Sequence, residues 1–148
     1  MRSRQRGFSL VEVLTTLVVM SVGMLGIAGL YVQSMQAGHS SMFRHHAVTL
    51  AGDVADRIRA NPTAGIAYTA ANVANIDCAA GGPDCDSGQM AAHDIGLWKS
   101  QAADTLPAGK VTIVFDAAVV PPTYLIAVSW NEIGEQLSYE IKISVLGY

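Results

Sequence analysis

One acidic residue stands inside a long apolar stretch near the start of the chain. From Phe8 to Val32 the sequence reads FSLVEVLTTLVVMSVGMLGIAGLYV, and Glu12 is its only charged residue. As an α-helix this stretch would be about 37 Å long, which exceeds the roughly 30 Å hydrocarbon core of a bilayer. A carboxylate within a membrane-length helix is costly unless a partner compensates it. Glu12 therefore indicates a functional site.

The residues before this stretch form a basic leader, 1–7. It contains Arg2, Arg4 and Arg6 and no acid, which predicts a cytoplasmic N-terminus and an exported C-terminal part. A secretory signal would have an apolar region of roughly 7–15 residues, followed by a small-residue cleavage site. The apolar stretch is longer, and no convincing site of that kind follows it. We therefore expect a membrane anchor, with a cleaved secretory signal and an ordinary uncleaved anchor as the alternatives.

The junction between leader and anchor carries a specific motif. It reads GFSLVEVL over residues 7–14 and resembles the class III signal of type IV prepilins and type II secretion pseudopilins. The resemblance implies that a prepilin peptidase cuts after Gly7 on the cytoplasmic side and leaves the anchor in place. It also implies that the new N-terminal residue, Phe8, is N-methylated. Glu12 matches the family's glutamate, which meets the N-terminal amine of a neighbouring subunit entering the filament.

The exported part is acidic and contains both cysteines. The chain has 148 residues and a net charge of −3, and loss of the three leader arginines takes the side chains to −6. Such a domain has no general attraction for DNA, so we predict no direct nucleic-acid partner. Cys78 and Cys85 are an even pair in an oxidising compartment, which predicts a disulfide. The alternative is half of a metal site, for which only His93 is near in sequence.

Helical periodicity continues beyond the membrane stretch. Apolar residues recur at spacings of three and four, as on one face of an amphipathic helix; they are Phe43, Ala47, Leu50, Val54 and Ile58. Asp53 and Arg57 form an i, i+4 pair on this helix. We predict one long helix, with a transmembrane and filament-core segment over 8–32 and an amphipathic spine over 33–60. Pro62 ends it.

A loop and a second helix are predicted next. Residues 61–88 begin with Asn-Pro-Thr-Ala-Gly and contain a Gly-Gly-Pro turn at 81–83 between the cysteines, which predicts a loop. Asp86 and Gln89 fit a capping box that begins a helix over about 87–104, and Pro107 follows its end. The expected packing residues of this helix are Met90, Ile95, Leu97 and Trp98.

Three runs with period-two alternation close the chain. Their apolar residues are Val111, Ile113 and Phe115, then Tyr124, Ile126, Val128 and Trp130, then Leu137, Tyr139, Ile141, Ile143 and Val145. This pattern predicts half-buried antiparallel strands. One face of the sheet needs a cover, and the apolar stripe of the spine is available. The expected fold is α+β, with a long N-terminal helix on a small three-stranded antiparallel sheet, as in type IV pilins. Residues 61–148 would form the globular periplasmic region.

The sequence contains few groups that could carry catalysis. His45 and His46 are adjacent, so on a helix they diverge and cannot form an i, i+4 metal pair. Asp77, Asp84 and Asp86 lie near the cysteines but lack the spacing of an EF-hand, so a solvated loop is favoured over a calcium site. No nucleophile elbow, HExxH helix or phosphate-binding loop occurs. We predict no enzymatic activity, no cofactor and no metal site.

Further segments resemble one branch of the pilin superfamily. They are similar to minor pilins of the PilV type, the type IV pilus modification proteins, and comprise residues 21–30, 50–62, 89–98, 106–109 and 128–130. The resemblance implies a low-abundance subunit that joins other minor pilins in a complex that primes pilus assembly, at or near the tip. Effects on adhesion, motility and DNA uptake would be indirect.

This interpretation names partners and a location. The expected partners are prepilin peptidase, other minor pilins, the major pilin and the inner-membrane assembly platform. The chain would cross the inner membrane once, with its C-terminal domain in the periplasm, and would then enter the extracellular pilus. The alternatives are a type II secretion pseudopilin, a membrane-anchored periplasmic binding or enzymatic domain whose leader is never cut, and a stand-alone adhesin.

Overall fold

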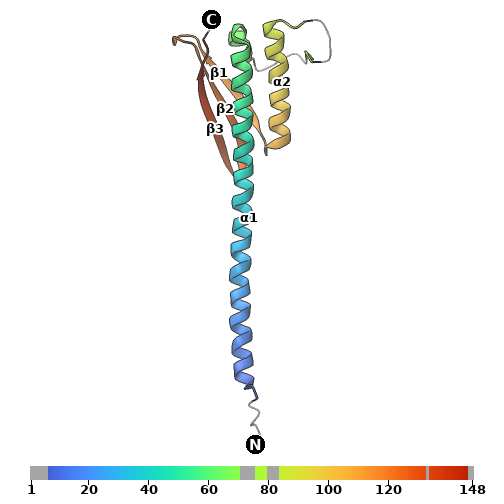
Figure 1. The fold of residues 1–148 in the computed structure, drawn as a ribbon, viewed down its shortest axis with the longest axis vertical. Coiled ribbons are helices and arrows are strands. Elements are labelled where there is room, and N and C mark those ends of the chain that lie inside the picture. Colours follow the sequence, from blue (N-terminus) through green and yellow to red (C-terminus); the bar gives the residue numbers. More distant parts are fainter. Residues whose placement is uncertain (1–6, 71–75, 80–83, 133, 147–148) are drawn as a thin grey trace, which may run out of the picture. The chain divides into compact units, whose positions relative to one another are not determined.

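The computed structural model describes residues 7–70, 76–79, 84–132 and 134–146. The elements, drawn in Figure 1, are α1 (Leu10–Ala60), the 3-10 helix η1 (Pro62–Thr69), α2 (Ser87–Thr105), β1 (Lys110–Asp116), β2 (Thr123–Glu132) and β3 (Glu135–Ser144). The chain divides after His39 into two units, the first holding the apolar part of α1 and the second the remaining elements. Each unit is described by itself.

The first unit is an apolar helix without a core. Every described residue from Gly7 to His39 is exposed, including large apolar side chains such as Leu17 and Leu25. Within the described residues, α1 is the one helix long and apolar enough to cross a membrane. A helix that is apolar all round needs lipid or other helices around it.

The second unit is built around the C-terminal part of α1. The side chains of Ala47, Leu50, Val54 and Ile58 are buried, as the spacing predicts, and Phe43 packs at the edge of the core. Two small residues of the same helix, Ala51 and Ala55, are also buried.

The region after α1 is more ordered than the sequence suggests. The predicted loop over 61–88 is wrong over Pro62–Thr69, which forms η1. Proline at its first position fixes φ at a helical value. Tyr68, which is 1% exposed, stacks on Trp98 with 5.7 Å between ring centroids and meets Tyr124 edge-on. Aromatic packing at long range therefore orders a segment whose local composition favours a loop.

Helix α2 begins as predicted but packs differently. Asp86 accepts the Gln89 backbone N–H and Gln89 accepts the Asp86 N–H, so the capping box forms. Ile95 and Trp98 are buried, whereas Met90 and Leu97 are exposed, so two of the four predicted packing residues are wrong. The buried stripe instead contains small residues, which a search for large apolar side chains overlooks; they are Ala91, Ala92 and Ala102.

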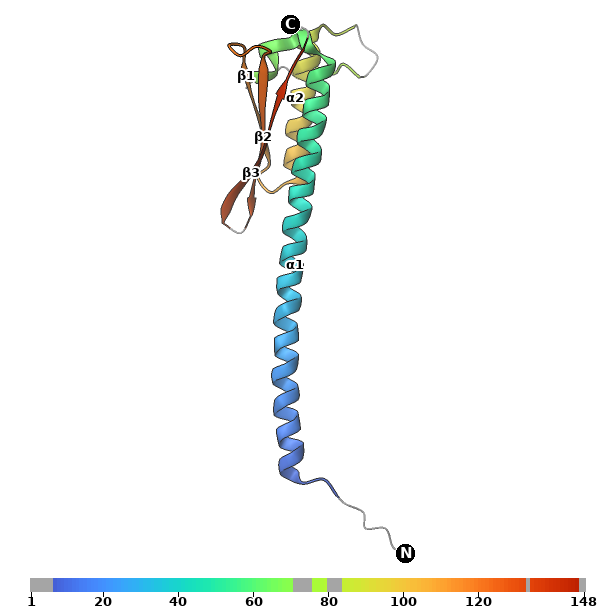
Figure 2. The same cartoon turned by 60° about the vertical axis from the view of Figure 1, so that its left-hand side comes forward.

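The three strands form one antiparallel sheet in the order β1-β2-β3. Ile113, Ile126 and Ile141 lie opposite one another across it. The inward residues of the central strand are fully buried, while those of β1 and most of β3 are partly buried. Figure 2 shows α2 and the C-terminal part of α1 on one side of the sheet. The predicted long helix on a three-stranded antiparallel sheet is thus confirmed.

Candidate functional site

The predicted processing and assembly residues occupy one short segment at the start of α1. Gly7 and Phe8 precede the helix, and Phe8 is 85% exposed. A Cβ added at Gly7 would meet no atom within 4 Å, so the fold does not itself require a glycine there. Glu12 lies in the first turn of the helix, one turn beyond the junction.

This position changes the electrostatics of Glu12. The backbone N–H groups of Glu12 and Val13 donate to the carbonyl of Ser9 at 3.1 and 3.2 Å, which begins the helix. The free N–H groups of a helix N-terminus carry partial positive charge and stabilise a carboxylate by about 0.3–1 kcal/mol at an exposed site. Among the described residues, no basic side chain pairs with the Glu12 carboxylate. The helix end therefore compensates its charge only in part.

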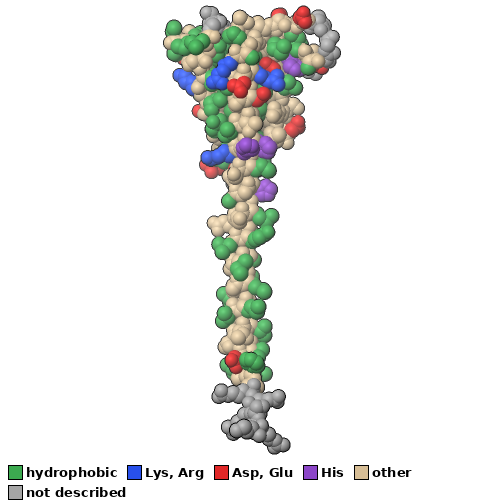
Figure 3. All heavy atoms as spheres, viewed as in Figure 1, with side chains coloured by type: hydrophobic (Ala, Val, Ile, Leu, Met, Phe, Trp, Pro, Cys, Tyr) green, Lys and Arg blue, Asp and Glu red, His purple; other side chains and the backbone are tan. Residues whose placement is uncertain are grey.

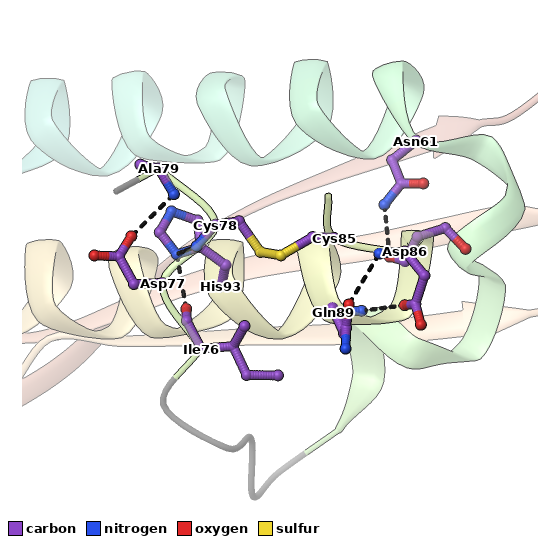
Figure 4. Close-up of a disulfide and its surroundings, with 10 residues drawn as sticks. Asn61, Ile76, Asp77, Cys78, Ala79, Cys85, Asp86, Gln89 and His93 are labelled. Carbon is purple, nitrogen blue, oxygen red and sulfur yellow. Dashed lines mark hydrogen bonds between the residues drawn. A yellow bond between two sulfur atoms is a disulfide. The ribbon is translucent and has the colours of Figure 1, made fainter. Parts of the chain in front are cut away.

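Cys78 and Cys85 form a disulfide that closes the loop before α2 (Figure 4). The loop is held against α2 by His93, whose Nδ1 lies 2.9 Å from the carbonyl oxygen of Ile76 and 3.3 Å from the backbone nitrogen of Cys78. Since both sulfurs are bonded to each other, neither thiol is available as a metal ligand. Within the described residues, no group of three or more His, Cys, Asp or Glu side chains is placed to hold a metal ion.

A partly buried ionic cluster joins α1, η1 and α2. Asp94 is only 2% exposed, and its carboxylate accepts from Arg57 Nη1 at 2.9 Å and from the Tyr68 hydroxyl at 3.1 Å. Arg57 also donates to Asp53, at 3.2 Å, which is the i, i+4 pair that the sequence predicts. The Nε1 of Trp98 donates to the same Asp53 carboxylate at 2.9 Å.

The protonation behaviour of the cluster follows from its contacts. Desolvation alone would lower the pKa of Arg57, but its hydrogen bond to Asp94 and the charge of Asp53 raise the pKa above its ordinary value. Burial raises the pKa of Tyr68 well above its ordinary value, and the nearby charge of Asp94 acts in the same direction. Arg57 thus stays cationic and Tyr68 neutral.

Sequence reasoning missed the role of Asp94, although a signal was present. Asp94 stands four residues before Trp98, on the same side of α2 as the buried stripe, and a charged residue at such a position needs a partner. Its partner Arg57 lies in segment 50–62 and Asp94 itself in segment 89–98, both noted for their resemblance to minor pilins. Among the described side chains, no buried polar atom lacks a hydrogen bond. The cluster therefore has the character of a brace between the helices.

Two family models match adjacent parts of the chain. The prokaryotic N-terminal methylation motif matches residues 2–28, and the family described as type IV pilin Tt1218 matches residues 29–96. These matches support a type IV pilin. The motif match covers residues 2–7 of the predicted leader and Glu12, and the pilin match covers the disulfide and the cluster residues Asp53, Arg57, Tyr68 and Asp94. No curated protein and no solved structure gives a significant match.

The structure agrees with a pilin at the level of fold and location. The long N-terminal helix with its three-stranded antiparallel sheet is consistent with the type IV pilin fold. The methylation motif and the apolar helix fit an anchor in the inner membrane. The pilin family is structural rather than catalytic.

Proposed function

We propose that this chain is a minor pilin of the PilV type, a low-abundance subunit that helps to prime type IV pilus assembly at or near the tip. The observation that carries the pilin part of the proposal is the methylation-motif match over residues 2–28, which includes the start of a helix exposed along its whole described apolar part. The minor, PilV-type part rests on the segments that resemble such pilins, among them 50–62 and 89–98. The described part of the first unit buries none of this apolar surface. Lipid and then neighbouring pilin helices are the surroundings that would cover it.

The proposed organisation follows the motif. The leader 1–7 is removed by prepilin peptidase, and 8–32 anchors the chain and later lies in the filament core. The segment 33–60 forms the spine, and 61–148 is the periplasmic region. The N-terminus is cytoplasmic until the subunit leaves the inner membrane for the pilus, and its neighbours are other minor pilins and the major pilin.

The proposed assembly contact joins Glu12 to the N-terminal amine of a neighbour. After cleavage, the amine of Phe8 remains cationic even when methylated. In hydrocarbon two unpaired charges would both be costly, so their pairing favours one axial register over others. Packing of the apolar helices supplies most of the cohesion.

Processing is tested by the N-terminal mass of the protein purified from membranes. The wild-type chain should begin at methylated Phe8, whereas Gly7→Leu should retain the leader. Ser3→Leu, which changes the leader but not the junction, serves as the control and should be processed normally. An intact leader in the wild-type protein would favour the membrane-anchored periplasmic domain instead.

Assembly is tested by Glu12→Ala. The variant should insert into the inner membrane at the wild-type level but be strongly depleted from sheared pili. Asp56→Ala removes an exposed acid from the same helix and should not alter incorporation. Normal incorporation of Glu12→Ala contradicts the proposed contact. Recovery of the wild-type chain in a type II secretion pseudopilus, and not in pili, would identify it as a pseudopilin.

A further inference from the structure

A methionine and two histidines lie within about one turn of α1 in the second unit. Met42 stands three residues before His45 and four before His46. Side chains at these spacings are neighbours on a helix surface, with about 5–6 Å between their Cβ atoms. The two histidines cannot form an i, i+4 pair with each other, but each is a neighbour of Met42. Figure 3 shows histidine side chains gathered on the surface of α1.

The two imidazole rings are close enough together to bind one ion. Their centroids are 6.3 Å apart, and their planes are inclined by 52°. Imidazole nitrogens bind a metal ion at about 2.0–2.1 Å, so two rings on one ion have centroids roughly 5–6.5 Å apart, with the largest values for a linear N–metal–N arrangement. The observed separation therefore fits a nearly linear pair better than the tetrahedral arrangement that zinc prefers.

The methionine supplies a donor of a different kind. Met42 is 46% exposed, His45 is exposed and His46 is half-buried, so an ion can reach all three from solvent. The methionine side chain is unbranched and flexible, which allows its sulfur to reach an ion held one turn further along the helix. Thioether sulfur is a soft ligand that selects Cu(I), whereas imidazole accepts several transition metals. One thioether with two imidazoles is thus a ligand set that favours Cu(I).

The charges near this turn disfavour hard divalent ions. On α1, no carboxylate occurs between Glu12 and Asp53, and Arg44 lies within the turn itself. A guanidinium repels a nearby cation in proportion to its charge, so a monovalent ion is disfavoured less than a divalent one. The connection between β2 and β3, with Glu132 and Glu135 at its ends, lies at the same end of the second unit (Figure 2). A ligand set that includes one of these carboxylates is therefore the alternative to test.

We propose that Met42, His45 and His46 form a surface site for Cu(I). The ion binds the Met42 sulfur and one nitrogen of each neutral imidazole. The site departs from the prediction of no metal site, which considered histidine, cysteine and carboxylate ligands but not methionine. All three ligands belong to the second unit and no other subunit is required, so the site does not rest on the proposed function.

The affinity is measured with the full-length chain in detergent micelles, under nitrogen and with ascorbate to keep the copper as Cu(I). The colorimetric chelator ferrozine competes for the ion, and its absorbance reports how much Cu(I) the protein takes. Met42→Leu and His45→Asn should each lower the affinity by at least about tenfold, since loss of even an outer-shell partner of a metal site costs about 10–100-fold. Met90→Leu removes an exposed methionine of α2 and should leave the affinity unchanged.

X-ray absorption at the copper edge identifies the donor atoms of the same samples. The wild-type chain should show a sulfur neighbour together with imidazole nitrogens, and Met42→Leu should lose the sulfur. A wild-type site with only nitrogen and oxygen neighbours would overturn the proposal. Tighter binding of Zn(II) than of Cu(I), or equal losses of affinity in Met42→Leu and Met90→Leu, would also overturn it. N-terminal processing and pilus incorporation are measured separately, so failure of the proposed function leaves this result unchanged.

Discussion

Replacement of Asp94 by alanine should destabilise the second unit more than any surface change on the same helices. The carboxylate is 2% exposed and accepts hydrogen bonds from Arg57 and from Tyr68. Asp94→Ala removes the acceptor for both donors, and η1 is then tied less firmly to the two helices it joins.

The magnitude can be worked from the exposure of the two donors. Hydrogen bonds to a charged group contribute about 1.5–3 kcal/mol each. The Arg57 side chain is 44% exposed and keeps its contact with Asp53. Water can therefore replace most of the hydrogen-bond energy that Arg57 loses with Asp94. The Tyr68 hydroxyl is buried, so water cannot easily replace the hydrogen bond that it loses with Asp94. We therefore expect a loss of about 2–4 kcal/mol, which lowers the melting temperature of a domain of this size by about 10–20 °C.

Urea and thermal unfolding of the segment from Ser40 onward, which contains the whole described core, measure this loss. Asp94→Asn retains the shape and one acceptor oxygen, so it should lose less, about 1–2 kcal/mol. Asp56→Ala is the matched control, because this acid pairs with Arg59 in solvent and should change the stability by under about 0.5 kcal/mol. A loss for Asp94→Ala no larger than that of Asp56→Ala would refute the bracing role of the cluster.

Three further outcomes are expected from the same unit. Gly109→Ala should cost about 2–4 kcal/mol in thermal unfolding, because its Cβ would collide with a backbone carbonyl of α2, whereas Gly52→Ala has open space and should gain up to about 1 kcal/mol. Replacing Cys78 and Cys85 by serine should lower the unfolding free energy by about 2.5 kcal/mol, the chain-entropy value for an eight-residue loop. Burial raises the pKa of Tyr68, so its stabilising contribution is complete below about pH 10, where the unfolded phenol stays neutral, and decreases above it. The fall in urea midpoint between about pH 8.5 and pH 10.5 should thus be smaller in Tyr68→Phe.

Periodicity predicted the elements with regular patterns and failed where contacts at long range decide. The stripe from Phe43 to Ile58 and the three strands were correct because one face of each must be buried. On α2, the expected packing residues Met90 and Leu97 are exposed. The structure buries Ala91 and Ala102 there instead, since the helix packs closely through small residues.

The ionic cluster could be predicted only in part. The spacing of Asp53 and Arg57 is local and gave a correct pair. The contact from Arg57 to Asp94 spans 37 residues, and the contact from Tyr68 to Asp94 spans 26. Residues this far apart in the sequence cannot be predicted to be in contact unless the fold is known. The same holds for η1, whose order depends on the packing of an aromatic ring.

The two units differ in where their stability comes from, and this difference bears on Glu12. The second unit buries a hydrophobic core of its own. The described residues of the first unit are exposed throughout, so its helix depends on whatever surrounds it. A carboxylate in the middle of such a helix would oppose insertion strongly, whereas one in the first turn is partly compensated by the helix N-terminus. If the proposed function is correct, the ionised Glu12 can therefore stay in the membrane before assembly at a modest free-energy cost. Pairing with the N-terminal amine of a neighbouring subunit would then stabilise it further. A charge at this position favours assembly without preventing the subunit from residing in the bilayer first.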